Sequence, residues 1–170
     1  HQNAAAKRSI AQKAAALVPN GSIVFLDQSS TCLHLAEALK DKQDLTVVTN
    51  NIAIASLLST TNFEVHLSGG YLCDKARVCL VGADSHQIFL NICADFVFFS
   101  THSLSSDGIA TDCNREEINV RNAMLKNAKC KVLLCDSSKF NSTAGFIQCG
   151  LQDLDMLVSE EQFLNAYFSI

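Results

Sequence analysis

Residues 27–31, Asp-Gln-Ser-Ser-Thr, form a run of small polar side chains between an apolar segment and a helix-like pattern. Hydroxyl groups and backbone amides at the start of a helix suit the oxygens of an anion such as phosphate. The same residues also suit a simple helix cap, with Ser29 or Ser30 as the capping side chain. Because Asp27 would repel a phosphate, we expect its carboxylate to accept hydrogen bonds from loop amides or a sugar hydroxyl. The run therefore predicts either a ligand-binding loop or a well-capped helix.

Four further polar segments follow apolar ones in the same way. They are Thr49-Asn50-Asn51, Ser68-Gly69-Gly70, Ser100-Thr101-His102 and Asp136-Ser137-Ser138-Lys139. In open α/β sheets the ligand binds beyond the carboxyl ends of the strands, where such segments converge. The pair Gly69-Gly70 would permit a positive φ or a close backbone approach to a ligand, or it forms a plain turn. The Lys139 ammonium group would meet a phosphate or a carboxylate there, or it is a solvated loop lysine.

Glu117 has two compatible interpretations. Asn114, followed by Glu117 three residues later, has the spacing of a capping box. Glu117 also shares a helical stripe with Val120 and Met124, which would point its carboxylate toward the core. Glu117 is therefore expected to order the helix start, to contact a ligand, or to do both.

Motifs for nucleotide binding, nucleophilic catalysis and metal binding are missing from the sequence. There is no Walker A loop, G-x-G-x-x-G loop or G-x-S-x-G elbow, and Ser30 and His34 are only helix neighbours. The five histidines lack metal-ligand spacing, and the eight cysteines are scattered without a C-x-x-C pair. Several cysteines lie in apolar runs, where a thiol acts as a small buried hydrophobe. We therefore expect no metal, cofactor or disulfide, and a reducing, cytoplasmic environment.

Strand-like and helix-like segments alternate along the chain. Strands are predicted at 22–27, 45–49, 63–70, 94–100, 130–136, 145–149 and 155–158, and helices at 3–18, 31–40, 51–59, 79–92, 115–128 and 160–168. A polar loop is expected between the strand at 94–100 and Asn114. The alternation predicts a Rossmann-like three-layer α/β sandwich with a mostly parallel sheet. The chain is too short for a (β/α)8 barrel of about 250 residues.

The composition sets further limits. The 170 residues suffice for one domain with a substantial core, and no linker divides them. The net charge is −4 and the 13 Lys and Arg residues are dispersed, so we do not expect this chain to bind DNA by itself. No apolar run reaches the roughly 18–20 residues that cross a bilayer. Because the chain lacks an initiating Met and a signal-peptide pattern, we expect an excised or trimmed domain.

Taken in order, the polar segments resemble a known family pattern. The chain is similar to the C-terminal effector-binding (sensor) domain of DeoR-family transcriptional regulators. The matching residues are Lys7, Ile10, Ala11, Ala14 and Ala15; Leu26 to Thr31; Thr49-Asn50; Gly69-Gly70; Asp95, Phe98 and Asp107-Gly108; Glu117; and Asp136-Ser137-Ser138-Lys139-Phe140. Each motif is common alone, whereas the ordered set covers nearly the whole chain.

The resemblance implies a fold shared with ribose-5-phosphate isomerase and glucosamine-6-phosphate deaminase. It also implies a sensor that binds a phosphorylated sugar or related metabolite without turning it over. A winged helix-turn-helix domain would precede residues 1–170 and contact DNA. The regulator would be a homo-oligomer, with no membrane association.

The resemblance assigns expected roles to the residues of the strand ends. Asp27 and Asn50 would hold sugar hydroxyls, and Glu117 would contact the sugar or order its helix. The phosphate would be gathered by Ser29, Ser30, Thr31, the Gly69-Gly70 backbone and Lys139. Thr49, Asp107 and Gly108 complete the expected ligand-binding set.

One departure from the family pattern bears on the ligand. Ser29-Ser30 stands where the family has Gly-Thr, so a loop that needs a positive φ there would strain Ser29 by about 1 kcal/mol or more. Alternatively the loop has a different shape. Two other functions remain open: a sugar-phosphate isomerase or deaminase, with Glu117 or Asp107 as base and Lys139 as electrostatic partner, and an oligomerisation domain whose site has decayed.

Overall fold

The computed structural model describes residues 3–73 and 79–160. Its centre is a sheet of six parallel strands in the order β11-β9-β6-β1-β2-β3. The strands are β1 (Ile23–Leu26), β2 (Thr46–Thr49), β3 (Glu64–Leu67), β6 (Ala94–Phe99), β9 (Ala128–Leu134) and β11 (Met156–Val158). The chain runs outward from β1 to β3 and then returns to the other side of β1 with β6. The strand order therefore reverses between β1 and β6, the place where doubly wound sheets hold their ligands.

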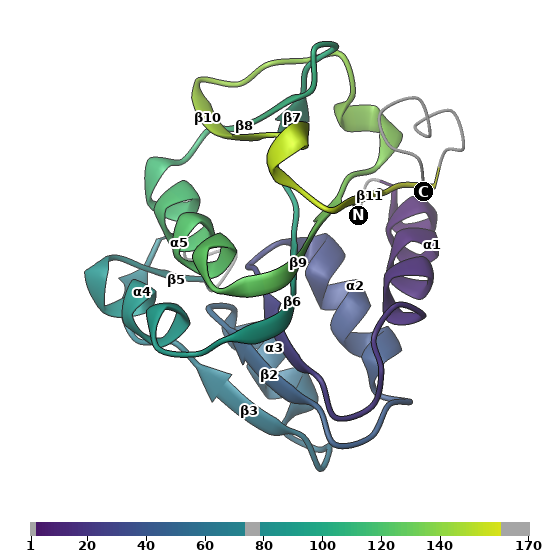
Figure 1. The fold of residues 1–170 in the computed structure, drawn as a ribbon, viewed down its shortest axis with the longest axis vertical. Coiled ribbons are helices and arrows are strands. Elements are labelled where there is room, and N and C mark those ends of the chain that lie inside the picture. Colours follow the sequence, from purple (N-terminus) through teal and green to yellow (C-terminus); the bar gives the residue numbers. More distant parts are fainter. Residues whose placement is uncertain (1–2, 74–78, 161–170) are drawn as a thin grey trace.

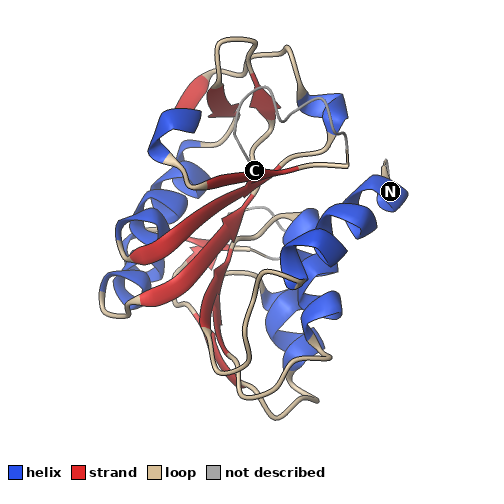
Figure 2. Ribbon diagram, turned by 45° about the vertical axis from the view of Figure 1, so that its right-hand side comes forward, coloured by secondary structure: helices blue, strands red, loops and turns tan. Residues whose placement is uncertain are grey.

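Helices cover both faces of this sheet (Figures 1 and 2). One face carries α1 (Ala4–Ala15), α2 (Ser30–Leu39) and α3 (Ile52–Leu58), and the other carries α4 (Ala83–Leu90) and α5 (Arg115–Lys126). Alternate residues of β1 serve the two faces. Val24 and Leu26 pack in the core beneath α1 and α2, whereas Phe25 packs in the opposite core, edge-on to Phe89 of α4. The expected three-layer α/β sandwich is confirmed.

A smaller layer lies beyond the carboxyl ends of β6 and β9 (Figure 1). It consists of the antiparallel sheet β10-β8-β7, with β7 (Ser103–Leu104), β8 (Ile109–Asp112) and β10 (Phe146–Gly150), and of the 3-10 turns η1 (Ser137–Lys139) and η2 (Leu151–Asp153). Its apolar residues, including Leu104 and Leu151, pack against Phe99 and Leu133 at the ends of the main strands. The expected polar loop before Asn114 is therefore wrong. The strands β7 and β8 are too short for alternation to reveal them.

A second antiparallel pair, β4 (Tyr71–Leu72) and β5 (Leu80–Val81), precedes α4. The helix expected from residue 79 therefore begins only at Ala83, because Gly82 takes a φ of 99° and separates the strand from the helix. The other expected elements agree with the structure apart from shifts at their ends. The helix expected at 160–168 lies outside the described residues. In the part of the chain that the structure describes, every helix is too short or too polar to traverse a lipid bilayer.

Candidate functional site

Asp27 lies at the centre of the carboxyl edge, the edge of the main sheet where β1, β2, β6 and β9 end. Its side chain is fully buried. Oδ1 accepts a hydrogen bond from the Ser29 amide at 2.9 Å, and Oδ2 accepts one from the Ser100 amide at 2.9 Å. The expected bonds from loop amides are confirmed. Since Ser100 follows β6, this carboxylate joins the two strand ends at which the strand order reverses.

Arg121 of α5 completes this centre, and it was not among the residues predicted from the sequence. Its buried guanidinium lies between three carboxylates, 3.0 Å from Asp27, 2.8 Å from Asp112 and 3.8 Å from Glu117. Burial disfavours the charged form, but the charges of Asp27 and Asp112 outweigh it, so the pKa of Arg121 is raised. The pair Glu117 and Arg121, four residues apart on one helix, was the sequence signal available.

An amide-rich part of the carboxyl edge consists of Gln28, Asn50 and Glu117, whose side chains are joined by hydrogen bonds. Glu117 Oε1 accepts a hydrogen bond from Gln28 Nε2 at 2.7 Å, and Asn50 Nδ2 approaches Gln28 Oε1 at 3.4 Å. Asn114 caps α5 by accepting from the Glu117 amide at 3.0 Å, so the side chain of Glu117 points inward while its backbone is capped. Among the described residues, the buried Oδ1 of Asn50 has no hydrogen-bond donor. A ligand hydroxyl placed here could supply one.

Two lysines form a cationic part of the edge. Lys7 of α1 donates to Ser30 Oγ at 2.9 Å, and Lys139 of η1 donates to Ser100 Oγ at 3.2 Å. Partial burial lowers the pKa of Lys7, the positive charge of Lys139 lowers it further, and Asp136 opposes the shift. The sequence prediction included Lys139 among the ligand-binding residues. It placed Lys7 only in the family pattern.

Ser29 caps α2 and is not strained. Its Oγ accepts from the Cys32 amide at 3.1 Å, and its φ is −69°. The loop needs no positive φ at this residue, so the strain considered for a serine in place of glycine is absent. Ser30 is the first residue of α2 and is exposed, whereas Thr31 is buried. Capping of α2 by Ser29 is confirmed. The first residue of the helix, Ser30, is bonded to Lys7 of the cationic part of the edge.

The expected ligand-binding residues Thr49 and Gly70 have structural tasks. Thr49 Oγ1 accepts from the Asn51 amide at 3.1 Å and orders the turn after β2. Asn51, which the prediction left out, caps α3 and donates to the Gln28 carbonyl at 3.0 Å. Gly70 has a φ of 109°, and a Cβ there would lie 2.3 Å from the Val81 carbonyl oxygen. Close packing against β5 therefore requires glycine at position 70. A Cβ at the neighbouring Gly69 would meet only ordinary contacts, the nearest at 3.4 Å from the Asp84 carbonyl oxygen.

Asp107 and Gly108 lie in the turn between β7 and β8. Asp107 is exposed and accepts a hydrogen bond from Ser105 Oγ. Gly108 has a φ of 84°, and its carbonyl accepts from the Leu151 amide at 2.9 Å. The described hydrogen bonds of Asp107 and Gly108 go to residues of the smaller layer, including Ser105 and Leu151. Two shallow surface hollows in the described part also lie elsewhere, one between α2 and α3 and one beside residues 19–22.

The fold and this edge define a class: a Rossmann-like α/β domain with a polar, partly cationic carboxyl edge at its strand reversal. The profile of the DeoR C-terminal sensor domain matches residues 2–161. The chain therefore belongs to the DeoR C-terminal sensor domain family, as the sequence motifs predicted.

Curated relatives are transcriptional regulators. An HTH-type transcriptional regulator of Escherichia coli K12, YgbI, is 32% identical over 156 residues, which is 91% of this chain and 60% of that protein. The glycerol-3-phosphate regulon repressor of Haemophilus influenzae is 30% identical over 153 residues, 89% of this chain and 59% of that protein. The chain thus spans about 60% of the length of these relatives.

Solved structures confirm the fold. Ribose 5-phosphate isomerase A from Methanocaldococcus jannaschii superposes with a TM-score of 0.59 at 15% identity, over 82% of this chain and 55% of that one. The eIF2B delta protein of Chaetomium thermophilum gives a TM-score of 0.67 at 15% identity, over 94% of this chain and 57% of that one. At such identities the likeness concerns the fold alone.

Proposed function

We propose that this sensor domain binds a phosphorylated sugar or a related small phosphate ester at the carboxyl edge. The observation that carries the proposal is the proximity of two lysines at the carboxyl edge: Lys7 is bonded to Ser30 at the start of α2, and Lys139 is bonded to Ser100 after β6. Partial burial and then the positive charge of Lys139 lower the pKa of Lys7, and a phosphate between the two ammonium groups would relieve their mutual repulsion. The hydroxyls of Ser30 and Ser100, each bonded to one lysine, would add donors.

The amide-rich part of the edge suits the remainder of such a ligand. Gln28, Asn50 and Glu117 offer amide and carboxylate groups to hydroxyls, and Asn50 Oδ1 is a buried acceptor in need of a donor. Asp27 lies between the two parts, with both oxygens engaged by the protein. Its expected contact with a sugar hydroxyl is therefore replaced in this proposal by a positioning role: Asp27 holds Ser29, Ser100 and Arg121 in place.

The ligand would act as a signal and would not be converted. In the whole regulator, a helix-turn-helix domain outside this chain would contact DNA, and the ligand would change its affinity for the operator through a homo-oligomer. Relatives named as HTH-type regulators and as glycerol-3-phosphate regulon repressors support this reading. Glycerol 3-phosphate is thus one of the small phosphate esters to test.

A thermal-shift screen tests the proposal. Glycerol 3-phosphate, ribose 5-phosphate and hexosamine 6-phosphates would be compared with the same compounds lacking phosphate and with inorganic phosphate. A true effector at 100 times its Kd adds about 2.7 kcal/mol to the free energy of unfolding. Replacing Lys7 or Lys139 by Ala should lower the affinity for that ligand roughly 10- to 100-fold. This corresponds to about 1.5–3 kcal/mol, the contribution of a hydrogen bond to a charged group.

Lys129→Ala is the matched control, since this exposed lysine lies on β9 beside Asp95 and away from the carboxyl edge. It should leave ligand affinity unchanged. If no phosphate ester stabilises the protein, the proposal fails in favour of a domain with a decayed site. Turnover of a sugar phosphate that is lost in Glu117→Gln would instead identify an enzyme.

A further inference from the structure

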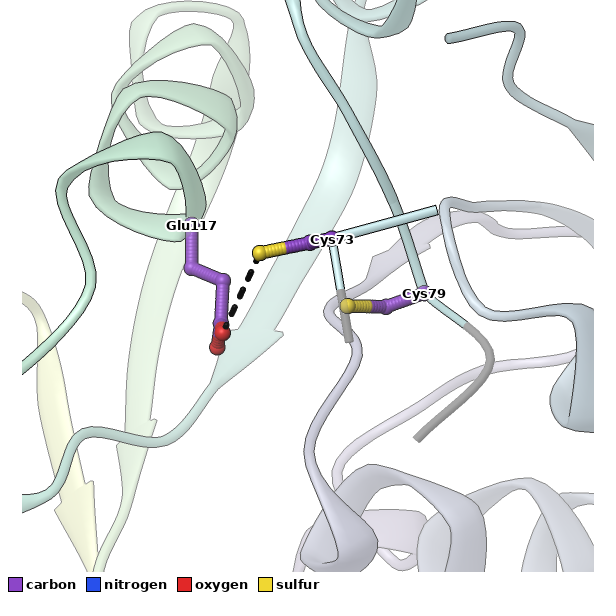
Figure 3. A group of neighbouring side chains, drawn as sticks. All are labelled: Cys73, Cys79 and Glu117. Atoms are coloured by element: carbon purple, nitrogen blue, oxygen red, sulfur yellow. Dashed lines mark hydrogen bonds between the residues drawn. The ribbon is translucent and has the colours of Figure 1, made fainter. Parts of the chain in front are cut away.

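A group of sulfur and oxygen ligands borders the candidate site. Figure 3 shows the side chains of Cys73, Cys79 and Glu117 gathered at one point, with the Cys73 thiol directed at the carboxylate. The two Sγ atoms and a carboxylate oxygen of Glu117 all lie within 4.8 Å of one another. Cys73 Sγ lies 3.9 Å from Glu117 Oε2. Both cysteines are thiols in the structure.

The β4–β5 pair places the two cysteines opposite each other. Tyr71 pairs with Val81 and Leu72 with Leu80, and the Cys73 amide donates to the Cys79 carbonyl at 3.0 Å. The pair is attached to the main sheet, because the Leu80 amide donates to the Asn50 carbonyl at 2.8 Å. The backbones of both cysteines are therefore anchored beside the amide-rich part of the carboxyl edge.

Neighbouring side chains orient the three ligands. Glu117 Oε1 is held by Gln28 Nε2 at 2.7 Å, which leaves Oε2 as the oxygen facing Cys73. Asn114 Nδ2 donates to Cys73 Sγ at 3.1 Å, while its Oδ1 caps α5. Asn114 lies at the start of α5, and its amide group orients the Cys73 sulfur beside the Glu117 carboxylate. Ligating groups in metal sites are oriented by such outer hydrogen bonds.

We propose that Cys73, Cys79 and Glu117 form a binding site for a thiophilic divalent metal ion of the Zn²⁺ class. Two thiolates and one carboxylate are a ligand set that zinc accepts, and the sulfur atoms disfavour Mg²⁺ and Ca²⁺. Three protein ligands leave the fourth tetrahedral position to water or to an oxygen of a bound metabolite. Each thiol releases one proton when the metal binds, and no electron is transferred.

Titration of the reduced chain with Co²⁺, without any sugar phosphate, tests the site. Thiolate-to-cobalt charge-transfer absorption should saturate at one equivalent and disappear when Zn²⁺ is added. The absorption should weaken in Cys73→Ser and in Cys79→Ser, and vanish when both are replaced. Cys93→Ser is the matched control, because this exposed cysteine lies between α4 and β6, and it should not alter the absorption.

Variants of Asn114 and Glu117 compare the effect of an orienting residue on metal affinity with that of a ligand. Asn114→Ser keeps a capping side chain but removes the amide donor, and it should weaken Zn²⁺ binding about 10- to 100-fold. Glu117→Gln, which removes a ligand, should weaken it more. Far-UV circular dichroism and melting without metal establish that each variant is folded.

A second measurement needs no variant. Bound Zn²⁺ should protect the half-buried Cys73 of the unaltered protein from alkylation, as mapped by peptide mass spectrometry, while the exposed Cys93 and Cys113 stay reactive. The proposal is overturned if no charge-transfer band forms, if the band survives loss of both cysteines, or if the metal does not protect Cys73 from alkylation. Because no phosphate ester is present, these outcomes do not bear on the proposed effector.

Discussion

Asp27 and Arg121, both buried, form an ion pair with 3.0 Å between Oδ2 and Nε. The pair joins the loop after β1 to α5, and it lies where the strand order reverses between β1 and β6. Asp112 and Glu117 share the same guanidinium, so one cation serves three carboxylates. These three carboxylates therefore depend on a single arginine as their shared cation.

Replacing Arg121 by Met should destabilise the domain by about 3–5 kcal/mol, because the change leaves buried carboxylates without their cation. Urea denaturation followed by circular dichroism measures the loss. Lys129→Ala, on the surface, should cost about 0.5 kcal/mol or less. A loss for Arg121→Met no larger than that of the control would contradict the central role of this ion pair.

Replacing Ser29 by Ala should cost about 0.5–2 kcal/mol, because the Cys32 amide loses its acceptor. Ser29→Gly, which restores the residue of the family pattern, should cost only a few tenths of a kcal/mol. Since φ is −69° at this position, glycine offers no relief of strain. Denaturation midpoints compare the two variants, and a glycine variant more stable than the natural protein would refute the assigned conformation.

Gly70→Ala should destabilise the domain by more than about 1 kcal/mol, because the residue has a φ of 109° and its new Cβ would meet the Val81 carbonyl. Gly145→Ala is the matched control, since a Cβ there has no atom within 4 Å. The shift of β5 should also weaken ligand binding through the bond from Asn50 to the Leu80 carbonyl. Equal melting temperatures for the two variants would contradict this prediction.

The lowered pKa of Lys7 makes both stability and binding depend on pH. Since the pKa of the folded state lies below the ordinary value of 10.5, the unfolded chain keeps this proton to a higher pH. The contribution of Lys7 to stability therefore rises with pH between the two pKa values. Phosphate affinity should fall over the same window, because deprotonation removes a cation from the site.

Lys139→Ala should raise the pKa of Lys7, because it removes the neighbouring positive charge. Nuclear magnetic resonance of the lysine side chains follows this titration, and calorimetry follows binding against pH. An unchanged Lys7 pKa in this variant would show that the two ammonium groups do not interact.

The sequence was sufficient to predict the positions at which most strands of the main sheet end. Each apolar run that stops at a polar residue marks a strand end, and Asp27, Asn50, Ser100 and Lys139 accordingly lie at the carboxyl edge. The pattern also predicted a helix cap at Ser29 or Ser30, because capping is a local interaction, and the structure shows that the capping residue is Ser29. The ligand-binding roles of these residues stay predictions.

Contacts between distant segments could not be read from the sequence. Arg121 has the spacing of an ordinary helix residue, and its three carboxylates come from three different elements. Cys73 and Cys79 match no spaced metal motif, because the register of β4 against β5 brings them together. Strand β7 has two residues, too few for any periodic signal.

The place of β1 in the sheet has a consequence for synthesis on the ribosome. Asp27 and Arg121 are 94 residues apart in the chain. At about 5–20 residues per second, translation needs roughly 5–20 seconds to make the arginine after the aspartate. During that time the nascent chain already contains the helices of one face, but the carboxylate has no guanidinium to pair with. A chain interrupted before α5 would therefore contain every residue of the first loop and still lack a formed carboxyl edge.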